Sequence, residues 1–448
     1  MQVELRELTE QNKMTGTHSK AERASHEWTA TEIVEAVTAG KATCEAVVRA
    51  CLERIALREP DVQAWTYLDP EQVIGYSRAL DRSGRRGALI GVPFGIKDII
   101  DTCDMPTQCG SPIYAGHRPR TDAACVALSR KAGGVLMGKT VTTEFANQYP
   151  GKTRNPFDPA RTPGGSSSGS AAAVGDRMVP LAIGTQTTGS TIRPASFCGA
   201  FGYRPTWGDL RCVGVKEAAG SLDTLGLIAR SIEDIALYRD VLFGTEPVPI
   251  PAESGVPRIG FCRTHLWRAL EPSTQHLLED AARRLAKAGA QVKEIELPAD
   301  FERLDAAHRW ISSFEFARNF TWEIENHWDG ISPRLRNGRI KDGLSCSVET
   351  YLQSRSFAER CRSVFADSFG QCDVLLTAAA TGEAPVGLSS TGNAAPSTMW
   401  TAVHAPSVTI PAFRGPNGLP VGAQLIGKRN QDRDLFAAAR WVHTALKS

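Results

Sequence analysis

Apolar and polar positions follow two different periods in the first part of the chain. Apolar residues spaced three and four apart predict amphipathic helices near 31–37 and 47–55, and helical sequence continues to about residue 79. Apolar and β-branched runs bounded by glycine predict buried strands at 88–100, 134–139 and 178–183. The two periods together indicate a domain in which helices and strands alternate.

The same alternation continues toward the C-terminus. The further predicted elements are a helix at 122–132, strands at 257–261 and 291–295 on either side of a helix at 273–288, and strands at 373–376 and 407–410. Residues from about 301 to 369 are mostly helical and rich in aromatic and charged side chains, which is typical of a cover over a site. We therefore predict an α/β fold with a mixed central β-sheet covered by helices on both sides.

Length and composition allow one large α/β domain or two to three smaller ones. The chain has 448 residues, of which 42% are apolar and 22% charged, as in a globular protein. Its net charge of +2 gives no electrostatic reason to expect nucleic acid or an anionic membrane as a partner. No apolar run approaches the roughly 18 residues of a membrane-spanning helix.

The N-terminus and the cysteines bear on the cellular compartment. Residues 1–27 form a polar lead-in without the apolar core of a signal peptide. The 11 cysteines are scattered without a C-x-x-C pair, and the closest two, Cys103 and Cys109, are a weak metal signal. We expect reduced thiols, no bound metal and a cytoplasmic protein.

Two clusters of glycine and hydroxyl residues flank the predicted strand at 178–183. Their sequences are PGGSSSGSAAA at 163–173 and GTQTTGS at 184–190. Glycines allow sharp turns that point N–H groups inward, and serine is a nucleophile once a base activates it. Because a flexible linker would not alternate with core sequence in this way, we expect function to reside here.

The first cluster contains the pattern G-x-S-x-G, with Ser167 at its centre. In α/β-hydrolases this pattern follows directly on a strand. Prolines at positions 156, 159 and 163 exclude a central strand before Ser167. The segment also lacks the Gly-Lys-Ser/Thr ending of a phosphate-binding loop. The sequence therefore argues against both interpretations.

One lysine, Lys97, lies within the apolar stretch at 88–100. Burial disfavours the charged form of lysine, so a desolvated amine loses its proton more easily and can act as a base. The alternative is a side chain whose stem packs on the core while the amine reaches water. Taken alone, Lys97 favours the second interpretation.

Three parts of the sequence together resemble the amidase signature family of serine hydrolases. They are Lys97, the serines around Ser166 and the pair Gly189–Ser190. That family has a Gly-Gly-Ser-Ser-Gly-Gly-Ser stretch followed by Gly-Thr-Asp-x-Gly-Gly-Ser. Its two serines are 24 positions apart, which is also the separation of Ser166 and Ser190. The likeness runs from GVPFGIKD at 91–98 to RPT at 204–206, with a weaker echo at 418–427.

The resemblance implies a single α/β/α domain over residues 28–448, with a signature core at about 85–210 and the helical cover at about 301–369. It implies a Ser-Ser-Lys triad in which Ser190 attacks the carbonyl, Ser166 relays its proton and Lys97 is the terminal base. The peptide bond before Ser166 is expected to be cis.

The resemblance also implies an oxyanion hole and a chemistry without cofactors. The oxyanion donors would be the backbone N–H groups of Thr187, Thr188, Gly189 and Ser190. Neither a metal nor an organic cofactor is required. Lysine replaces histidine as the base, so His117 and His404 are expected to be surface or packing residues.

The chain departs from the common family pattern at three positions. Gln186 stands where the family usually has Asp, Thr188 stands where it usually has Gly, and Arg193 comes one position later than usual. These departures weaken assignment to the glutamyl-tRNA amidotransferase branch. A backbone N–H survives the change from Gly to Thr, so the hydrolytic chemistry is still expected.

The expected function is hydrolysis of a neutral small or medium carboxamide through an acyl-enzyme. A carbamate or ester substrate would use the same triad. The competing classes are a non-catalytic relative and an amidotransferase subunit, which would need a partner protein and tRNA. A homodimer is a further expectation.

The sequence leaves the substrate-binding residues undetermined. Helices in 301–369 and the small-residue run 377–382 are candidates for the pocket wall, and the run is equally consistent with a plain surface loop. The absence of an arginine cluster near that run favours neutral, apolar substrates over carboxylates.

Overall fold

A single mixed sheet of eleven strands organises the described part of the chain, in the order β1-β3-β2-β4-β6-β5-β10-β11-β9-β7-β8. The computed structural model describes residues 23–252 and 255–447. The strands are β1 (Trp65–Leu68), β2 (Pro93–Lys97), β3 (Val135–Thr140), β4 (Leu181–Gln186), β5 (Phe201–Arg204), β6 (Thr224–Ala229), β7 (Arg258–Phe261), β8 (Gln291–Glu294), β9 (Val374–Ala378), β10 (Ser407–Arg414) and β11 (Pro420–Ile426). Most of the predicted lead-in, residues 1–22, lies outside the described residues.

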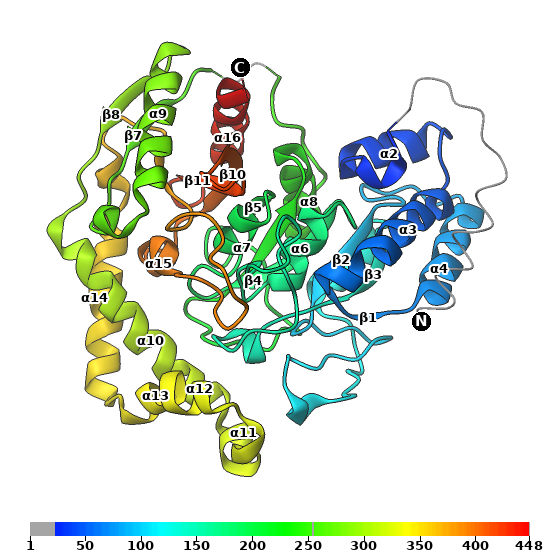
Figure 1. Cartoon of the computed structure of the whole chain (residues 1–448), viewed down its shortest axis with the longest axis horizontal. Helices are drawn as coiled ribbons and strands as arrows, with labels where there is room; N and C mark the ends of the chain where they lie inside the picture. The colour runs from blue at the N-terminus through cyan, green and yellow to red at the C-terminus, as the bar shows by residue number, and fades with distance from the viewer. Residues whose placement is uncertain (1–22, 253–254, 448) are drawn as a thin grey trace.

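The helices alternate with the strands along the chain and form separate groups around the sheet (Figure 1). They are α2 (Ala30–Thr38), α3 (Cys44–Val62), α4 (Pro70–Ser83), α5 (Ala124–Lys131), α6 (Ser168–Gly175), α7 (Ile192–Phe197), α8 (Ile232–Phe243), α9 (Pro272–Lys287), α10 (Leu304–Asn319), α11 (Thr321–Asn326), α12 (Pro333–Leu335), α13 (Lys341–Ser345), α14 (Val348–Val364), α15 (Ala395–Ala402) and α16 (Asp432–Lys447). Figure 1 shows α2–α4 and α10–α14 on opposite sides of the molecule.

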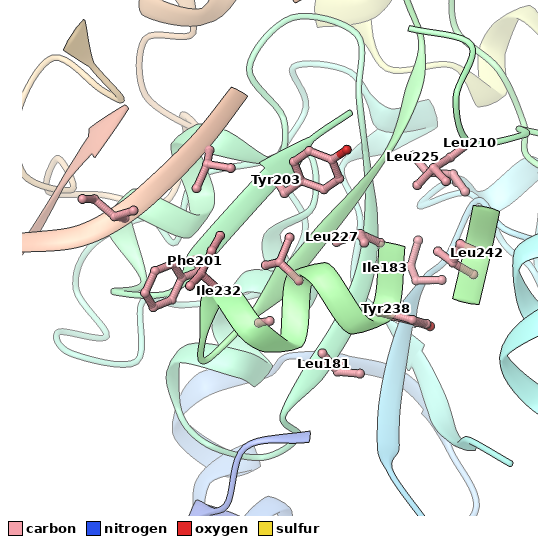
Figure 2. Packing of buried hydrophobic residues seen from close by; sticks show 14 of the residues in the cluster. Leu181, Ile183, Phe201, Tyr203, Leu210, Leu225, Leu227, Ile232, Tyr238 and Leu242 are labelled. Carbon is pink, nitrogen blue, oxygen red and sulfur yellow. The ribbon is translucent and has the colours of Figure 1, made fainter. Parts of the chain in front are cut away.

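The alternation of side chains along β4 explains why both faces of the sheet are covered. Leu181 and Ile183 belong to one hydrophobic cluster, whereas Ala182 between them belongs to another. Successive residues of a strand point to opposite faces, so a strand that is apolar throughout must be buried on both. On the first face α8 packs Ile232 and Tyr238 over β4, β5 and β6, as Figure 2 shows.

Different helices supply the two faces. Buried residues of α5, α8, α9 and α16 join the cluster that contains Leu181, while those of α4 and α6, and those of α3 other than Val47, join the cluster that contains Ala182. Beyond β5, helices α10, α14 and α15 form a third cluster with Leu375 of β9 and Ile426 of β11. The predicted α/β/α architecture with a mixed sheet is confirmed.

Most predicted elements are present, with three corrections in the first half of the chain. The helical sequence predicted to residue 79 is interrupted by the edge strand β1, because α3 ends at Gln63 in a left-handed conformation and the β-forming Trp65 and Tyr67 pair with β3. The strand predicted at 88–100 is confined to β2, and the one predicted at 178–183 begins and ends three residues later as β4.

The C-terminal predictions are closer to the structure. Strands β7 and β8 are parallel and α9 connects them, as the βαβ pattern indicated. Residues 301–369 are mostly helical, as predicted. Within the described residues, no helix combines the length and the apolar character that crossing a membrane requires.

Candidate active site

The candidate site lies where two neighbouring parallel strands end. Strand β2 pairs in parallel with β4, and Lys97 is the last residue of β2, while Thr185 and Gln186 close β4. The two glycine-serine clusters lie next to this edge, since one leads into α6 and the other leads from β4 into α7. Ligands of open α/β sheets bind outside the carboxyl ends of the strands, so this edge is where a site is expected.

Lys97 is buried and held between two hydroxyl groups. Its Nζ donates hydrogen bonds to Ser166 Oγ and Thr185 Oγ1, both at 2.7 Å. Its side chain is 0% exposed, and this burial lowers the pKa of the Lys97 amine to about 7, against a weaker opposing effect of Asp223. The packed stem with a hydrated amine is therefore excluded, and a substantial fraction of the amine is neutral near pH 7.

The serines of the first cluster divide into two groups. Ser166 is buried, contacts Lys97 and follows a cis peptide bond after Gly165, as the resemblance implied. Ser167 instead donates to the Thr185 carbonyl and accepts from the Thr185 N–H, both at 3.2 Å. The side chain of Ser167 is therefore engaged with β4, which agrees with rejecting it as a nucleophile.

Two more serines fasten α6 to the sheet. Ser168 Oγ donates to the Val141 carbonyl, just beyond β3, at 3.2 Å. Ser170 Oγ donates to the Ile183 carbonyl of β4 at 3.1 Å and lies 2.7 Å from Thr140 Oγ1 of β3. These hydroxyl contacts fix the N-terminus of α6, and hence Ser166, against the end of the sheet.

The second cluster forms the loop 187–190 between β4 and α7. Thr187 and Gly189 are buried, whereas Thr188 and Ser190 are half-buried. The Ser190 carbonyl accepts a hydrogen bond of 3.3 Å from the Ser167 N–H, so this loop runs beside the first serine cluster. The structure thus places Ser190 next to Ser167, one residue from the Lys97–Ser166 pair, and leaves the residue partly exposed.

Gln186, where the family usually has Asp, caps the helix after this loop. Its Oε1 accepts hydrogen bonds from the N–H groups of Thr191 and Ile192, at 3.0 and 3.1 Å. The first N–H groups of a helix have no partner within the helix, so an outside acceptor stabilises this end. Gln186 therefore caps the start of α7 with its amide oxygen.

Three side chains that the sequence did not single out surround the loop. His308 of α10 lies 2.7 Å from the Thr187 carbonyl, and burial lowers the pKa of His308 to about 4. Asp223 accepts a 2.5 Å hydrogen bond from Thr187 Oγ1, and burial raises the pKa of this carboxyl. Thr401 of α15 donates to the Thr188 carbonyl at 2.8 Å.

Arg193 supports the first cluster from α7. The side chain is 4% exposed and donates to the Thr391 carbonyl at 2.8 Å and to the Gly165 carbonyl at 2.5 Å. Burial lowers the pKa of Arg193 to about 10. The guanidinium therefore ties the residue before Ser166 to the segment that precedes α15.

Replacing Arg193 with lysine is expected to lower the free energy of unfolding by about 1–3 kcal/mol, because a single ammonium cannot reproduce the fork that holds two separate carbonyls. Urea unfolding of R193K and the wild type measures the change. R283K on the exposed surface of α9 is the matched control, with an expected change within about 0.5 kcal/mol. Equal stability of R193K and the wild type would contradict the role of this clamp.

The other candidate residues lie as follows. His404 is buried, stacks on Trp207 and lies 2.8 Å from the Ser221 carbonyl, which confirms it as a packing residue. His117 is exposed, as expected. The run 377–382 is buried or half-buried, and the Thr381 carbonyl accepts from the Glu271 N–H, so a plain surface loop is excluded.

All 11 cysteines are free thiols, and Cys103 and Cys109 differ in burial. Cys103 is exposed beside Asp104 and Asp122, where three potential metal-ligand atoms lie within 4.8 Å of one another. Both carboxylates already pair with Arg130, at 2.7 and 3.3 Å. The ion pairs with Arg130 therefore explain why Asp104 and Asp122 lie so close together, and no metal is needed to explain it.

Comparisons with known proteins agree on one family. The sequence pattern of the family described as Amidase matches residues 46–436. One relative, a glutamyl-tRNA(Gln) amidotransferase subunit of Chloroflexus aggregans, is 32% identical over 88% of this chain and 91% of its own length. A crystal structure of an amidase has a TM-score of 0.85 at 27% identity, covering 93% of this chain and 99% of that one. Native peptide amidase from Stenotrophomonas maltophilia has a TM-score of 0.81 at 27% identity, covering 94% and 97%.

The fold and these likenesses define an enzyme of the class that hydrolyses or transfers amide C–N bonds. The chain belongs to the amidase family, whose members carry the amidase signature.

Proposed function

We propose that this enzyme hydrolyses the C–N bond of a neutral small or medium carboxamide through an acyl-enzyme at Ser190. Ser166 is the proton relay and Lys97 the terminal base. The observation that supports this proposal most strongly is the 2.7 Å contact between Lys97 Nζ and Ser166 Oγ, in a buried setting that lowers the pKa of the amine to about 7. A base with a pKa near the working pH is the most effective kind.

Acylation moves one proton along the three residues. Ser190 Oγ attacks the amide carbonyl carbon while its proton passes to Ser166 Oγ, and the proton of Ser166 passes to Lys97 Nζ. The tetrahedral oxyanion is stabilised by the backbone N–H groups of the loop 187–190. Collapse breaks the C–N bond, and the leaving nitrogen takes its proton from Ser166, which recovers one from Lys97.

Deacylation repeats these steps with water as the nucleophile. Lys97 and Ser166 remove a proton from water, the hydroxyl oxygen bonds to the acyl carbon, and the Ser190 ester bond breaks. Ser190 Oγ regains a proton and the carboxylic acid is released. An ester or carbamate follows the same route with a different leaving group, so both remain alternative substrates.

The charges near the loop suit a neutral substrate. Asp223 contacts Thr187, and Arg339 lies near enough to Asp223 and His308 to affect the pKa of each. The formal charges of this carboxylate and this guanidinium cancel. A neutral carboxamide therefore needs no compensating ion at this site.

A role within an amidotransferase complex is the second candidate. It is favoured by the relatives that are subunits of glutamyl-tRNA(Gln) amidotransferase, one of which matches over 91% of its length. Against it stand Gln186 and Thr188 within the signature. Such a subunit would depend on a partner protein and tRNA, whereas an independent amidase would not.

Incubating the purified chain alone with primary amides, anilides, carbamates and esters tests both candidates. Release of ammonia or amine without any partner supports the independent amidase. Turnover that appears only with added partner proteins and tRNA would identify the amidotransferase role. No turnover of any substrate, and no labelling by a fluorophosphonate, would contradict the proposed function. The homodimer and the cytoplasmic location stay predictions, the second supported by the 11 free thiols.

The rate should rise with pH through about 7. Lys97 accepts a proton only when neutral, so kcat/KM is expected to fall about tenfold for each pH unit below the pKa of Lys97 and to level off above it. The measurement is kcat/KM from about pH 5 to about pH 9 with a substrate that does not ionise in that range. A flat profile across this range would remove Lys97 as the base.

A further inference from the structure

Two successive carbonyl groups of the loop 187–190 are held by residues of helices α10 and α15. His308 of α10 contacts the Thr187 carbonyl at 2.7 Å, and Thr401 of α15 donates to the Thr188 carbonyl at 2.8 Å. Since a carbonyl only accepts, the His308 Nε2 must carry the proton in the first contact. Both partners are buried, at 4% and 0% exposed.

Fixing a carbonyl also fixes the N–H that follows it. In a trans peptide the C=O and the next N–H lie in one plane and point in opposite directions. The contact at the Thr187 carbonyl therefore turns the Thr188 N–H away from α10, and the contact at the Thr188 carbonyl turns the Gly189 N–H away from α15. In the part of the chain that the structure describes, neither N–H has an acceptor.

Helix α15 also supports the loop by direct packing. A Cβ atom placed on Gly189 would lie 3.2 Å from both the Ala394 carbonyl oxygen and Ser397 Cβ. The backbone at Gly189 therefore rests closely on the start of α15. This packing limits how far the peptide plane between Thr188 and Gly189 can rotate.

Gln186 sets the direction of the Thr401 hydroxyl. Because Gln186 Oε1 accepts from the two N–H groups at the start of α7, its other amide atom is the donor, and it donates to Thr401 Oγ1 at 3.2 Å. The hydroxyl has one proton, which is then directed to the Thr188 carbonyl. A glutamate here, which has the same shape, would place an acceptor where the amide nitrogen lies, so it would accept that proton and turn it away from the loop.

We propose that His308, Thr401 and Gln186 are positioning residues that aim the N–H groups of Thr188 and Gly189 at the oxyanion of the tetrahedral intermediate. This inference rests on the proposed acyl-enzyme chemistry. It assigns a reason to Gln186 in the place of the family's usual Asp, since only an amide both caps α7 and directs the Thr401 proton. None of the three side chains needs to contact the substrate.

Thr401→Val removes the hydroxyl and keeps the side-chain shape, whereas Thr401→Ser keeps the hydroxyl. We expect T401V to lower kcat by about 10- to 100-fold with little change in KM, because a misdirected oxyanion donor weakens the transition state more than the bound substrate. T401S should retain most of the wild-type kcat. The control T274V changes a buried threonine of α9 whose hydroxyl has no partner among the described residues, and it should behave as the wild type.

His308 and Gln186 extend the test with the same design. His308→Gln retains an N–H donor and should keep more activity than His308→Leu. Gln186→Glu should lower kcat as T401V does, although its carboxylate can still cap α7. Affinity for a trifluoromethyl ketone analogue of the best substrate, which forms a tetrahedral adduct, should fall in parallel with kcat, while affinity for the product acid should not change.

The outcomes separate this inference from the proposed function. A wild-type enzyme that neither turns over amides nor reacts with a fluorophosphonate would overturn the proposed function and this inference with it. An active wild type with T401V and H308L unchanged in kcat would overturn the inference alone. Equal losses in T401V and T401S, accompanied by lower melting temperatures, would also overturn it, because the side chains would then serve only the fold.

Discussion

Replacing Ser190 with alanine is expected to abolish formation of the acyl-enzyme. Without Oγ no covalent bond to the substrate can form, so turnover should fall to the residual level that binding and the oxyanion donors provide. Ser190 is half-buried in the loop before α7, and the change removes a single oxygen atom, so the fold should persist. Fluorophosphonate labelling followed by mass spectrometry of the labelled peptide measures the effect directly.

Two control variants define what the S190A result means. Ser345→Ala removes an exposed serine hydroxyl from α13 and should leave labelling and turnover unchanged. Ser166→Ala should slow labelling of Ser190 strongly, because the contact to Lys97 is lost. A label found on Ser166 or Ser167 in S190A would show that another serine is the nucleophile.

Replacing Lys97 with methionine is expected to lower kcat by roughly 10²- to 10⁴-fold, the usual contribution of a general base. The free energy of unfolding at neutral pH should stay at or above the wild-type value, since methionine fills the same space without a group that must lose its proton on burial. Kinetics and urea unfolding of the same preparation measure both effects. A near-normal kcat would remove Lys97 from the mechanism.

The pH dependence of stability gives a second readout for K97M. The unfolded lysine keeps its proton up to its ordinary pKa of 10.5, whereas burial lowers the folded value to about 7. Between these values the unfolded chain binds more protons, so stability should rise with pH in that window. K97M should lack this contribution to the rise.

The second buried lysine, Lys139, is the matched control. It is also 0% exposed, but it donates to Thr107 at 2.6 Å and lies 3.7 Å from a carboxylate oxygen of Asp98. K139M would leave that buried carboxylate without its cation, at a cost of about 3 kcal/mol or more. Burial of Lys97 is expected to lower the stability of the folded protein, as is usual for a residue kept for catalysis. If K97M lost as much stability as K139M, this expectation would be contradicted.

The sequence predicted the parts of this protein that depend on local patterns. Leu181, Ala182 and Ile183 of β4 are apolar on both faces, so the pattern indicated a buried strand. The βαβ unit of β7, α9 and β8 could be predicted because short strands and a long amphipathic helix have distinct periods. The positions of Lys97, Ser166 and Ser190 came from motif spacing, and their roles stay predictions.

What the sequence could not predict depends on contacts between distant segments. β1 is only 4 residues long and follows a long helix, so its strand signal was too short to stand out. Thr185 is a weak signal by itself, and only the pairing of β2 with β4 makes it a partner of Lys97. His308 and Thr401 lie in ordinary helical sequence, 121 and 213 residues from the carbonyls that they contact.

Those long separations in sequence also bear on the order in which parts of the site are made and folded. All three proposed triad residues precede position 191, yet two of the contacts that hold the loop come from α10 and α15. During synthesis the proposed nucleophile, Ser190, is therefore made well before the helices that hold its loop, and contacts of such long sequence separation are slow to form. A nascent chain that ends before α10 would carry all three proposed triad residues without the contacts that hold the loop, so on the proposed mechanism we expect full activity to require α10 and α15 as well.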